Sequence, residues 1–106
     1  MIKENQIEFL IREIADAYQP EKIYLFGSYA TDKPTTDSDI DLFIVKDTTK
    51  RKIERSREVR KCIKRYPTAG LDIIVYTPEE LKSCMAQTMN IGKEAVTTGK
   101  LVYERI

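Results

Sequence analysis

Two aspartates separated by one residue, Asp39 and Asp41, stand at the start of the apolar run Ile40–Val45. β-Branched and aromatic residues dominate that run, which predicts a buried β-strand over residues 40–45. Residues i and i+2 of a strand point to the same face, with Cα atoms about 6.5 Å apart, so both carboxylates are expected in one small volume. Like charges this close repel each other, and a divalent cation removes the repulsion. Because Mg²⁺ takes carboxylate and phosphate oxygens as ligands, the pair predicts a magnesium site.

A glycine and a serine, Gly27 and Ser28, lie upstream of the aspartates and follow the strand-like run 23–26. Glycine lets the backbone approach a phosphate closely, and the next amides, together with the Ser28 hydroxyl, can donate hydrogen bonds to phosphate oxygens. Each motif alone has an ordinary explanation, a tight turn for Gly-Ser and a solvated strand end for Asp-x-Asp. Their combination on consecutive predicted strands favours a site for a metal-bound phosphate.

A third acidic residue, Asp72, lies near the start of the apolar run 71–76, which also predicts a strand. Taken alone, this residue could equally be an exposed aspartate at a strand edge or one paired with a lysine or an arginine. If the three predicted strands are neighbours in one sheet, Asp72 completes a three-carboxylate site with Asp39 and Asp41. Such a site can hold two metal ions about 3.5–4 Å apart and stabilise both the attacking and the leaving oxygen of a phosphoryl transfer.

Together these segments resemble the minimal nucleotidyltransferases of the DNA polymerase β superfamily. The resemblance covers nearly the whole chain and rests on Gly27-Ser28-Tyr29-Ala30, on Ser38-Asp39-Ile40-Asp41-Leu42 and on Asp72 in an apolar strand. It implies that the paired aspartates bind Mg²⁺, with two ions expected, and that Asp72 completes the metal site and helps to deprotonate an acceptor hydroxyl. It also implies that the Gly-Ser turn holds the terminal phosphates of an NTP, with ATP expected.

The resemblance implies a reaction and a partner as well. Such enzymes transfer a nucleoside monophosphate from an NTP to an acceptor hydroxyl and release pyrophosphate. Stand-alone relatives of this size commonly pair with a small helical HEPN protein in toxin–antitoxin modules, where the transferase modifies the toxin, so an antitoxin role is the expectation.

One departure concerns the segment after Gly-Ser-x-Ala. Many relatives continue with Arg-Gly or Lys-Gly, whereas this chain has Thr31-Asp32. A lost cation and an added carboxylate oppose the binding of a triphosphate, although Lys33 can compensate. This leaves open a catalytically degenerate member of the fold that binds its partner or a nucleotide without turnover.

The composition excludes several other classes of protein. With 106 residues the chain is expected to form a single domain over residues 1–106, and 42% hydrophobic with 33% charged residues is typical of a soluble globular protein. No apolar run approaches transmembrane length and the amino terminus has no signal-peptide pattern, so we expect a cytoplasmic protein that does not contact a membrane. Histidine is absent and the two cysteines are not in Cys-x-x-Cys spacing, which argues against zinc and leaves proton transfer to carboxylates or water.

Charge is distributed unevenly along the chain. Residues 46–65 hold ten Lys or Arg residues against three acidic ones, a net charge of +7, so the rest of the chain carries −6 because the total is +1. Apolar residues recur within this segment at helical spacing: Ile53, Val59, Cys62, Ile63 and Tyr66. We therefore expect an amphipathic helix over residues 50–65 with a basic outer face, in a segment whose cations include Arg55. That face is explained by solvation alone, by an acidic protein partner, or by a nucleic-acid-binding domain that uses this basic helix.

The remaining segments supply further helices. A first helix, ended near Gln19-Pro20, is predicted from one apolar stripe, with Phe9 off the stripe and exposed: Ile7, Leu10, Ile11, Ile14, Ala17 and Tyr18. Thr77-Pro78-Glu79-Glu80 predicts another helix start, and a last helix is expected over residues 86–97, closing at Gly99 before Leu101-Val102-Tyr103.

We therefore expect an α/β (α+β) fold, a small mixed β-sheet with helices packed on one face. The resemblance identifies this fold with the polymerase-β-like nucleotidyltransferase core. A nucleotide-sugar transferase that uses Asp-x-Asp with a metal is a weaker alternative, because such enzymes normally need a much longer chain.

Overall fold

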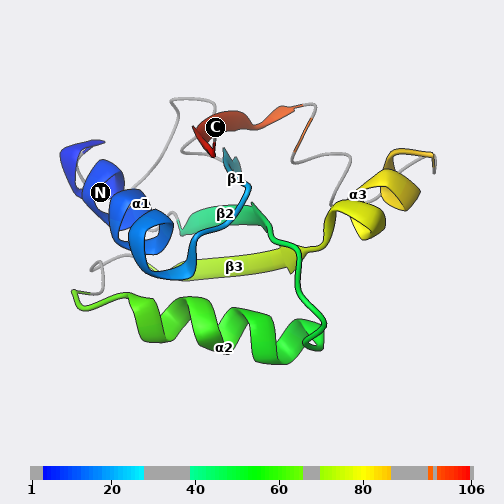
Figure 1. Cartoon of the computed structure of the whole chain (residues 1–106). Helices are drawn as coiled ribbons and strands as arrows, with labels where there is room; N and C mark the ends of the chain where they lie inside the picture. Colours follow the sequence, from blue (N-terminus) through cyan, green and yellow to red (C-terminus); the bar gives the residue numbers. More distant parts are fainter. Residues whose placement is uncertain (1–3, 28–38, 66–69, 87–95, 97, 106) are drawn as a thin grey trace.

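The structure of the chain is a computed structural model that describes residues 4–27, 39–65, 70–86, 96 and 98–105. Its elements follow one another in the order α1 (Glu4–Tyr18), β1 (Lys22–Phe26), β2 (Ile40–Val45), α2 (Lys52–Cys62), β3 (Leu71–Tyr76), α3 (Pro78–Met85) and β4 (Lys100–Glu104) (Figure 1). The three predicted strands and the first three predicted helices are present, and β4 is an additional strand. The helix expected over residues 86–97 falls almost entirely outside the described residues. None of the described helices has the length and apolar character needed to cross a bilayer.

The four strands form one mixed sheet in the order β3-β2-β1-β4. β1 pairs antiparallel with both β2 and β4, whereas β2 and β3 run parallel. Parallel neighbours need a crossover connection, and α2 supplies it between β2 and β3. The register places Phe26 of β1 opposite Asp41 of β2, and Asp41 opposite Asp72 of β3.

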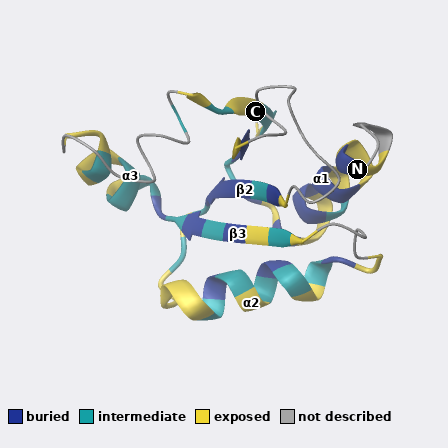
Figure 2. Ribbon diagram, turned by 180° about the vertical axis from the view of Figure 1, so that it is seen from behind, coloured by how far each residue is buried: buried dark blue, intermediate teal, exposed yellow. Residues whose placement is uncertain are grey.

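Alternate residues of each strand enter two different apolar layers. The layer shared with α1 and α2 is the larger and includes Ile23, Leu25, Ile40, Leu42, Ile44, Ile73 and Val75. The layer on the opposite face is smaller and consists of Tyr24, Phe26, Phe43 and Val45, against which Leu81 of α3 packs. The predicted fold class is confirmed, with α1 and α2 on one face of a small mixed sheet and a contact from α3 on the other. Figure 2 shows that β2 is mostly buried, that β3 is only partly buried, and that α2 and α3 expose much of their surface.

The buried stripe of α1 differs from the prediction at one position. Ala15 is buried and Ala17 is exposed, so the assignment of Ala17 to the core is wrong; the helical period places Ala15 beside Ile11 and Ile14 instead. Phe9 is 56% exposed, as predicted. The helix ends at Tyr18 because Gln19 adopts a positive φ of 54°, the left-handed conformation that closes many helices and that glycine usually provides.

α2 buries less apolar surface than the sequence predicts. Val59 and Ile63 are buried, but Ile53 is 57% exposed, so its assignment to the apolar side is wrong. Arg55, one of the cations of this segment, does not belong to the basic outer face, because it is buried with only 6% of its surface exposed. The side chain of Arg55 can be buried because it is hydrogen-bonded on several sides.

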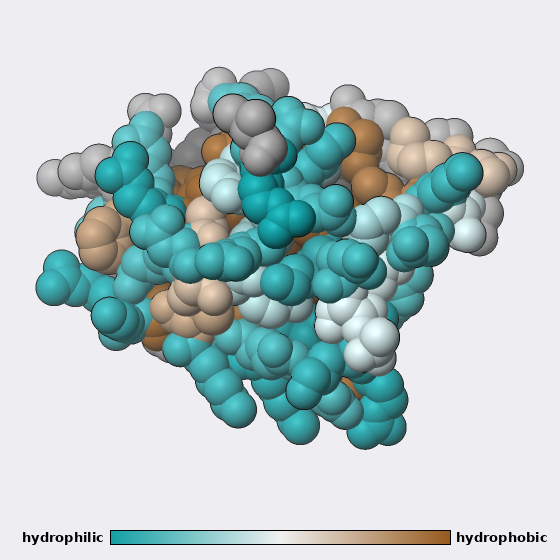
Figure 3. Space-filling view, in the orientation of Figure 1, coloured by the Kyte–Doolittle hydropathy of each residue, from teal (hydrophilic) through white to brown (hydrophobic). Residues whose placement is uncertain are grey.

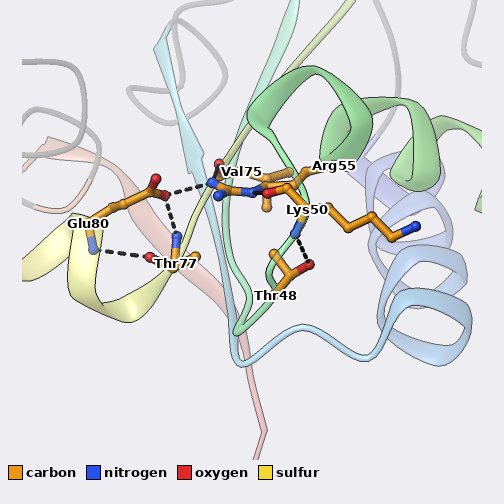
Figure 4. Close-up of polar contacts among 6 residues, drawn as sticks. All are labelled: Thr48, Lys50, Arg55, Val75, Thr77 and Glu80. Carbon is orange, nitrogen blue, oxygen red and sulfur yellow. Dashed lines mark hydrogen bonds and ion pairs between the residues drawn. The ribbon is translucent and has the colours of Figure 1, made fainter.

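The partners of Arg55 come from three parts of the chain (Figure 4). Its Nε donates to the Lys50 carbonyl at 2.6 Å, and its Nη1 donates to the Val75 carbonyl at 3.2 Å and to Glu80 Oε1 at 2.6 Å. Glu80 also closes a capping box with Thr77, the N-cap of α3. Burial alone would raise the pKa of Glu80, but the hydrogen bonds from Arg55 and Thr77 hold it below its usual value. Glu80 thus joins α2 to the start of α3, and Arg55 joins both to β3.

Candidate active site

The structure places the three predicted aspartates at the same end of the sheet. Asp39 directly precedes β2, Asp41 is the second residue of β2, and Asp72 is the second residue of β3. Asp41 and Asp72 are direct partners in the parallel register. Because Ile40 and Ile73 face α1 and α2, the alternating aspartates lie on the opposite face of the sheet. The strand positions therefore gather the carboxylates as the sequence predicts.

The carboxyl group of Asp41 is strongly perturbed by its surroundings. Burial, a hydrogen bond with Asp72 and the negative charges of Asp72 and Asp39 raise the pKa of Asp41 from 3.8 to about 6. Asp41 therefore keeps its proton to a higher pH than an exposed aspartate does, because its charged form lies beside two other carboxylates. Near neutral pH that proton is lost, and the excess negative charge attracts a cation.

Gly27 lies directly beside Asp41, where the chain leaves β1. Its φ of 76° falls in the left-handed region that favours glycine. A Cβ atom at this position would overlap Oδ2 of Asp41. Gly27 therefore allows the carboxylate to lie against the backbone at the end of β1. Ser28, predicted to bind phosphate with Gly27, and the Thr31-Asp32 departure lie outside the described residues.

Gly70 supports Asp39 in a similar way and was not predicted as a site residue. Its carbonyl accepts a hydrogen bond from the Ile40 amide at 2.8 Å, which starts the pairing of β2 with β3. A Cβ atom on Gly70 would overlap Oδ1 of Asp39, so a larger residue would displace that carboxylate. Only the parallel register reveals this role, because the sequence shows Gly70 merely as part of a break before a strand.

Two arginines of α2 hold the strand that carries Asp72. Arg60 Nη2 donates to the Leu71 carbonyl at 2.8 Å, one residue before Asp72, and Arg55 binds the Val75 carbonyl near the other end of β3. Both carbonyls belong to the edge of β3 that does not pair with β2. These contacts hold β3 beside β2 against the repulsion between the carboxylates of Asp72 and Asp41.

The donor atoms suit a hard divalent cation, but the side chains are not arranged around one. Carboxylate oxygens are the ligands that Mg²⁺ prefers. Within the described ranges, no group of three His, Cys, Asp or Glu side chains is placed to hold a metal ion. The register pairs Asp41 directly with Asp72, and the nearby charge of Asp39 also raises the pKa of Asp41. The residues therefore fit magnesium in chemical type and in location, but their side chains are not placed as its coordination shell.

A small mixed sheet of this order, with its two long helices on one face, is the architecture of a nucleotidyltransferase. The sequence matches the family described as Polymerase beta, Nucleotidyltransferase over residues 9–105, and the chain belongs to this family. The comparison with curated proteins gave no match.

Two solved structures have a similar fold. A Sulfolobus solfataricus protein provisionally named a nucleotidyltransferase is 23% identical, with a TM-score of 0.64 over 95% of this chain and 79% of that one. A mutant of the toxin–antitoxin MntA-HpeT is 22% identical, with a TM-score of 0.62 over 98% of this chain and 75% of that one. At these identities the structures support the fold, and the family match supports the class of protein.

Proposed function

We propose that the protein is a Mg²⁺-dependent enzyme that transfers a nucleoside monophosphate from an NTP, with ATP as the first candidate, to an acceptor hydroxyl. The observation that carries this proposal is the direct pairing of Asp41 with Asp72 on adjacent strands, with Asp39 close enough to raise the pKa of Asp41. Structural aspartates seldom gather in this way, because their repulsion opposes folding.

Each site residue has a proposed role that follows from its position. Asp39 and Asp41 would hold magnesium, with two ions expected, and the bound metal would neutralise the phosphate charge and polarise the reacting oxygens. Asp72, which is the direct strand partner of Asp41, would orient the acceptor hydroxyl and accept its proton. Gly27 would let the backbone approach the phosphates, and the Ser28 hydroxyl would donate a hydrogen bond to them.

The acceptor is proposed to belong to a protein partner, a HEPN toxin, which would make the chain an antitoxin. One structural relative is a toxin–antitoxin protein, MntA-HpeT, and its name records two Asp-to-Glu substitutions at positions two apart. Asp39 and Asp41 have the same separation in this chain. The relative supports a toxin as the kind of partner, and the family resemblance suggests the HEPN class.

The decisive experiment uses the native protein purified together with the proteins that accompany it. With labelled ATP and Mg²⁺, the parent should add a nucleoside monophosphate to a co-purified partner, detected by mass spectrometry. Asp72→Asn should lower this transfer about 10²–10⁴-fold because it removes the proposed proton acceptor, while much of the nucleotide affinity should remain. Asp47→Asn, an exposed change of equal charge in the loop after β2, is the control.

A binding module without turnover is the second candidate, and the Thr31-Asp32 departure favours it. It predicts that parent and Asp72→Asn bind Mg²⁺·NTP alike and that neither transfers the nucleotide to any co-purified partner. That result would refute catalysis while leaving the family assignment intact. A nucleic-acid-binding domain that uses the basic helix is the third candidate, and its binding should fall steeply with salt.

A further inference from the structure

The outer side of α2 presents a line of cations beside an exposed apolar residue, and neither is used by the proposed site. Ile53, Arg57 and Lys61 are exposed and recur every four residues, so they follow one side of the helix. Lys64 and Arg65, which follow the end of the helix, are exposed cations too. These five residues are here called the α2 stripe. In Figure 3 the lower edge of the molecule, where α2 lies, is predominantly hydrophilic.

The cations of the α2 stripe differ from five of the other six basic residues of segment 46–65, which have side-chain partners; Lys50 is the exception within the described residues. Those partners are Glu54 for Arg51 at 3.2 Å, the Tyr76 ring for Lys52 at 4.5 Å, the Tyr18 carbonyl for Lys46 at 2.6 Å, and the β3 carbonyls for Arg55 and Arg60. For Arg57 and Lys61, the described part of the chain provides no ion pair or side-chain hydrogen bond. The structure therefore separates the basic residues that support the fold from those that do not.

The α2 stripe has no evident stabilising role in the isolated chain. Arg57 and Lys61 are like charges four residues apart and repel each other, and Glu54 and Glu58, three residues before them, form no ion pair with them within the described residues. The helix dipole accounts for a cation in the last turn, where Lys61 lies, but not for Arg57 in the middle. An exposed apolar residue at Ile53 adds a further cost. Features that oppose local stability in this way indicate a binding surface.

The position of the α2 stripe leaves the proposed active site open. α2 packs against the sheet face formed by Ile40, Leu42 and Val75, whereas Asp41 and Asp72 alternate with these residues and lie on the opposite face. A partner bound to the outer side of α2 would therefore not cover the aspartates.

We propose that the α2 stripe is a docking surface for an acidic protein, whose carboxylates contact Arg57 and Lys61 and whose apolar residue covers Ile53. An apolar side chain that is 57% exposed has no counterpart on a phosphate backbone but suits the centre of a protein interface. No aromatic residue lies between positions 50 and 65 to stack on bases. This docking needs neither nucleotide nor turnover. An experiment that refutes the proposed catalysis would therefore not refute the docking, and the reverse also holds.

Two synthetic helical peptides of identical composition provide the probe. In the patterned peptide, glutamates recur every fourth residue along one side with a leucine one turn away; in the scrambled peptide they are spread around the helix. Fluorescence anisotropy with the full chain should show the patterned peptide binding at least about tenfold more tightly, with an association rate that falls as salt is added. Single-stranded poly(U) is the nucleic-acid probe.

Charge reversal locates the surface. Arg57→Glu with Lys61→Glu should weaken binding of the patterned peptide at least about tenfold, and the milder Arg57→Gln with Lys61→Gln should act in the same direction. Ile53→Ser should weaken it without changing poly(U) binding. Reversal of Arg12 and Lys82, exposed cations of α1 and α3, is the matched control and should have little effect.

Three outcomes overturn the proposal: equal binding of the two peptides, an effect of the stripe reversal no larger than that of the control, or poly(U) binding more tightly than the patterned peptide. Circular dichroism and the melting temperature of each variant show whether it is folded. If the reversed variant does not fold, the comparison rests on the glutamine pair and on Ile53→Ser, which change no buried contact.

Discussion

Asp41→Asn tests the electrostatic description of the site without any assumption about catalysis. The substitution removes the carboxyl group whose pKa is raised to about 6 by burial, by its hydrogen bond with Asp72 and by the charges of Asp72 and Asp39. Asparagine is nearly isosteric, and its amide can still donate a hydrogen bond to Asp72. We therefore expect the metal-free variant to be more stable than the parent at neutral pH.

The magnitude and the sign of the effect follow from linkage. Below the ordinary pKa of 3.8 the carboxyl is protonated in both the folded and unfolded states, so it changes nothing. Between 3.8 and about 6 the unfolded chain releases the proton first, and the folded state loses stability as pH rises. The full shift corresponds to ~3 kcal/mol, but Asp41 is only partly buried and solvent screening reduces the expected penalty to about 1 kcal/mol. For a domain of this size, that is a change in Tm of about 5 °C.

The assay is thermal unfolding in the presence of a chelator from pH 4 to pH 8. The Tm of Asp41→Asn minus that of the parent should be near zero at pH 4 and reach about 5 °C above pH 7. Asp47→Asn removes the same charge from an exposed loop residue and should show no such pH-dependent gain. A variant that melts below the parent at pH 7.5, or a difference that is the same at both ends of the pH range, would refute the reasoning.

In the presence of Mg²⁺·NTP, the parent rather than Asp41→Asn should have the higher Tm. At ten times its dissociation constant, Mg²⁺·NTP should stabilise the parent by about 1.4 kcal/mol, a Tm increase on the order of 5–10 °C. Asp41→Asn and Asp39→Asn should lose this increase because each removes a proposed ligand. An undiminished increase in both variants would show that the metal lies elsewhere.

Two further substitutions test the scaffold. Arg55→Met should lower the free energy of unfolding in urea by about 2–3 kcal/mol, because it leaves the Glu80 carboxylate without its charged partner. The control Arg57→Met, on the exposed side of α2, should change this free energy by less than about 0.5 kcal/mol. Equal effects of the two substitutions would contradict the burial of Arg55. Gln19→Gly should raise the free energy of unfolding by about 0.5–1 kcal/mol, because residue 19 has a positive φ that glycine adopts more easily. Gln19→Ala keeps a Cβ atom and should not raise it. An equal gain from alanine would contradict the left-handed conformation at the end of α1.

The positions of the three aspartates could be predicted because strand periodicity is local. Alternation within the runs 40–45 and 71–76 fixes which residues share a face, and this alone is enough to place Asp39 and Asp41 together. The direct pairing of Asp41 with Asp72 needed one further fact, the parallel register of β2 and β3. From the sequence alone, this pairing could be predicted only on the condition that the strands are neighbours in one sheet. Register depends on contacts between distant segments, which the sequence does not show directly.

The burial of Arg55 and the exposure of Ile53 could not be predicted in the same way. Both residues lie in the first turn of α2, where hydrophobic periodicity favours isoleucine inside and arginine outside. The structure reverses them because two backbone carbonyls and Glu80 surround the Arg55 guanidinium. Glu80 is far from Arg55 in the sequence, and its attraction appears only once β3 and α3 are in place.

The basic segment therefore serves two purposes that its sequence does not distinguish. Arg55 and Arg60 turn inward and hold both ends of β3, which opposes the repulsion that Asp72 meets beside Asp41. Arg57 and Lys61 turn outward and contribute no such contact within the described chain. A net charge of +7 over residues 46–65 thus reflects both a support for the strand that carries the site and a surface available to a partner. If so, removing the inward arginines should damage folding first, and removing the outward cations should damage association alone.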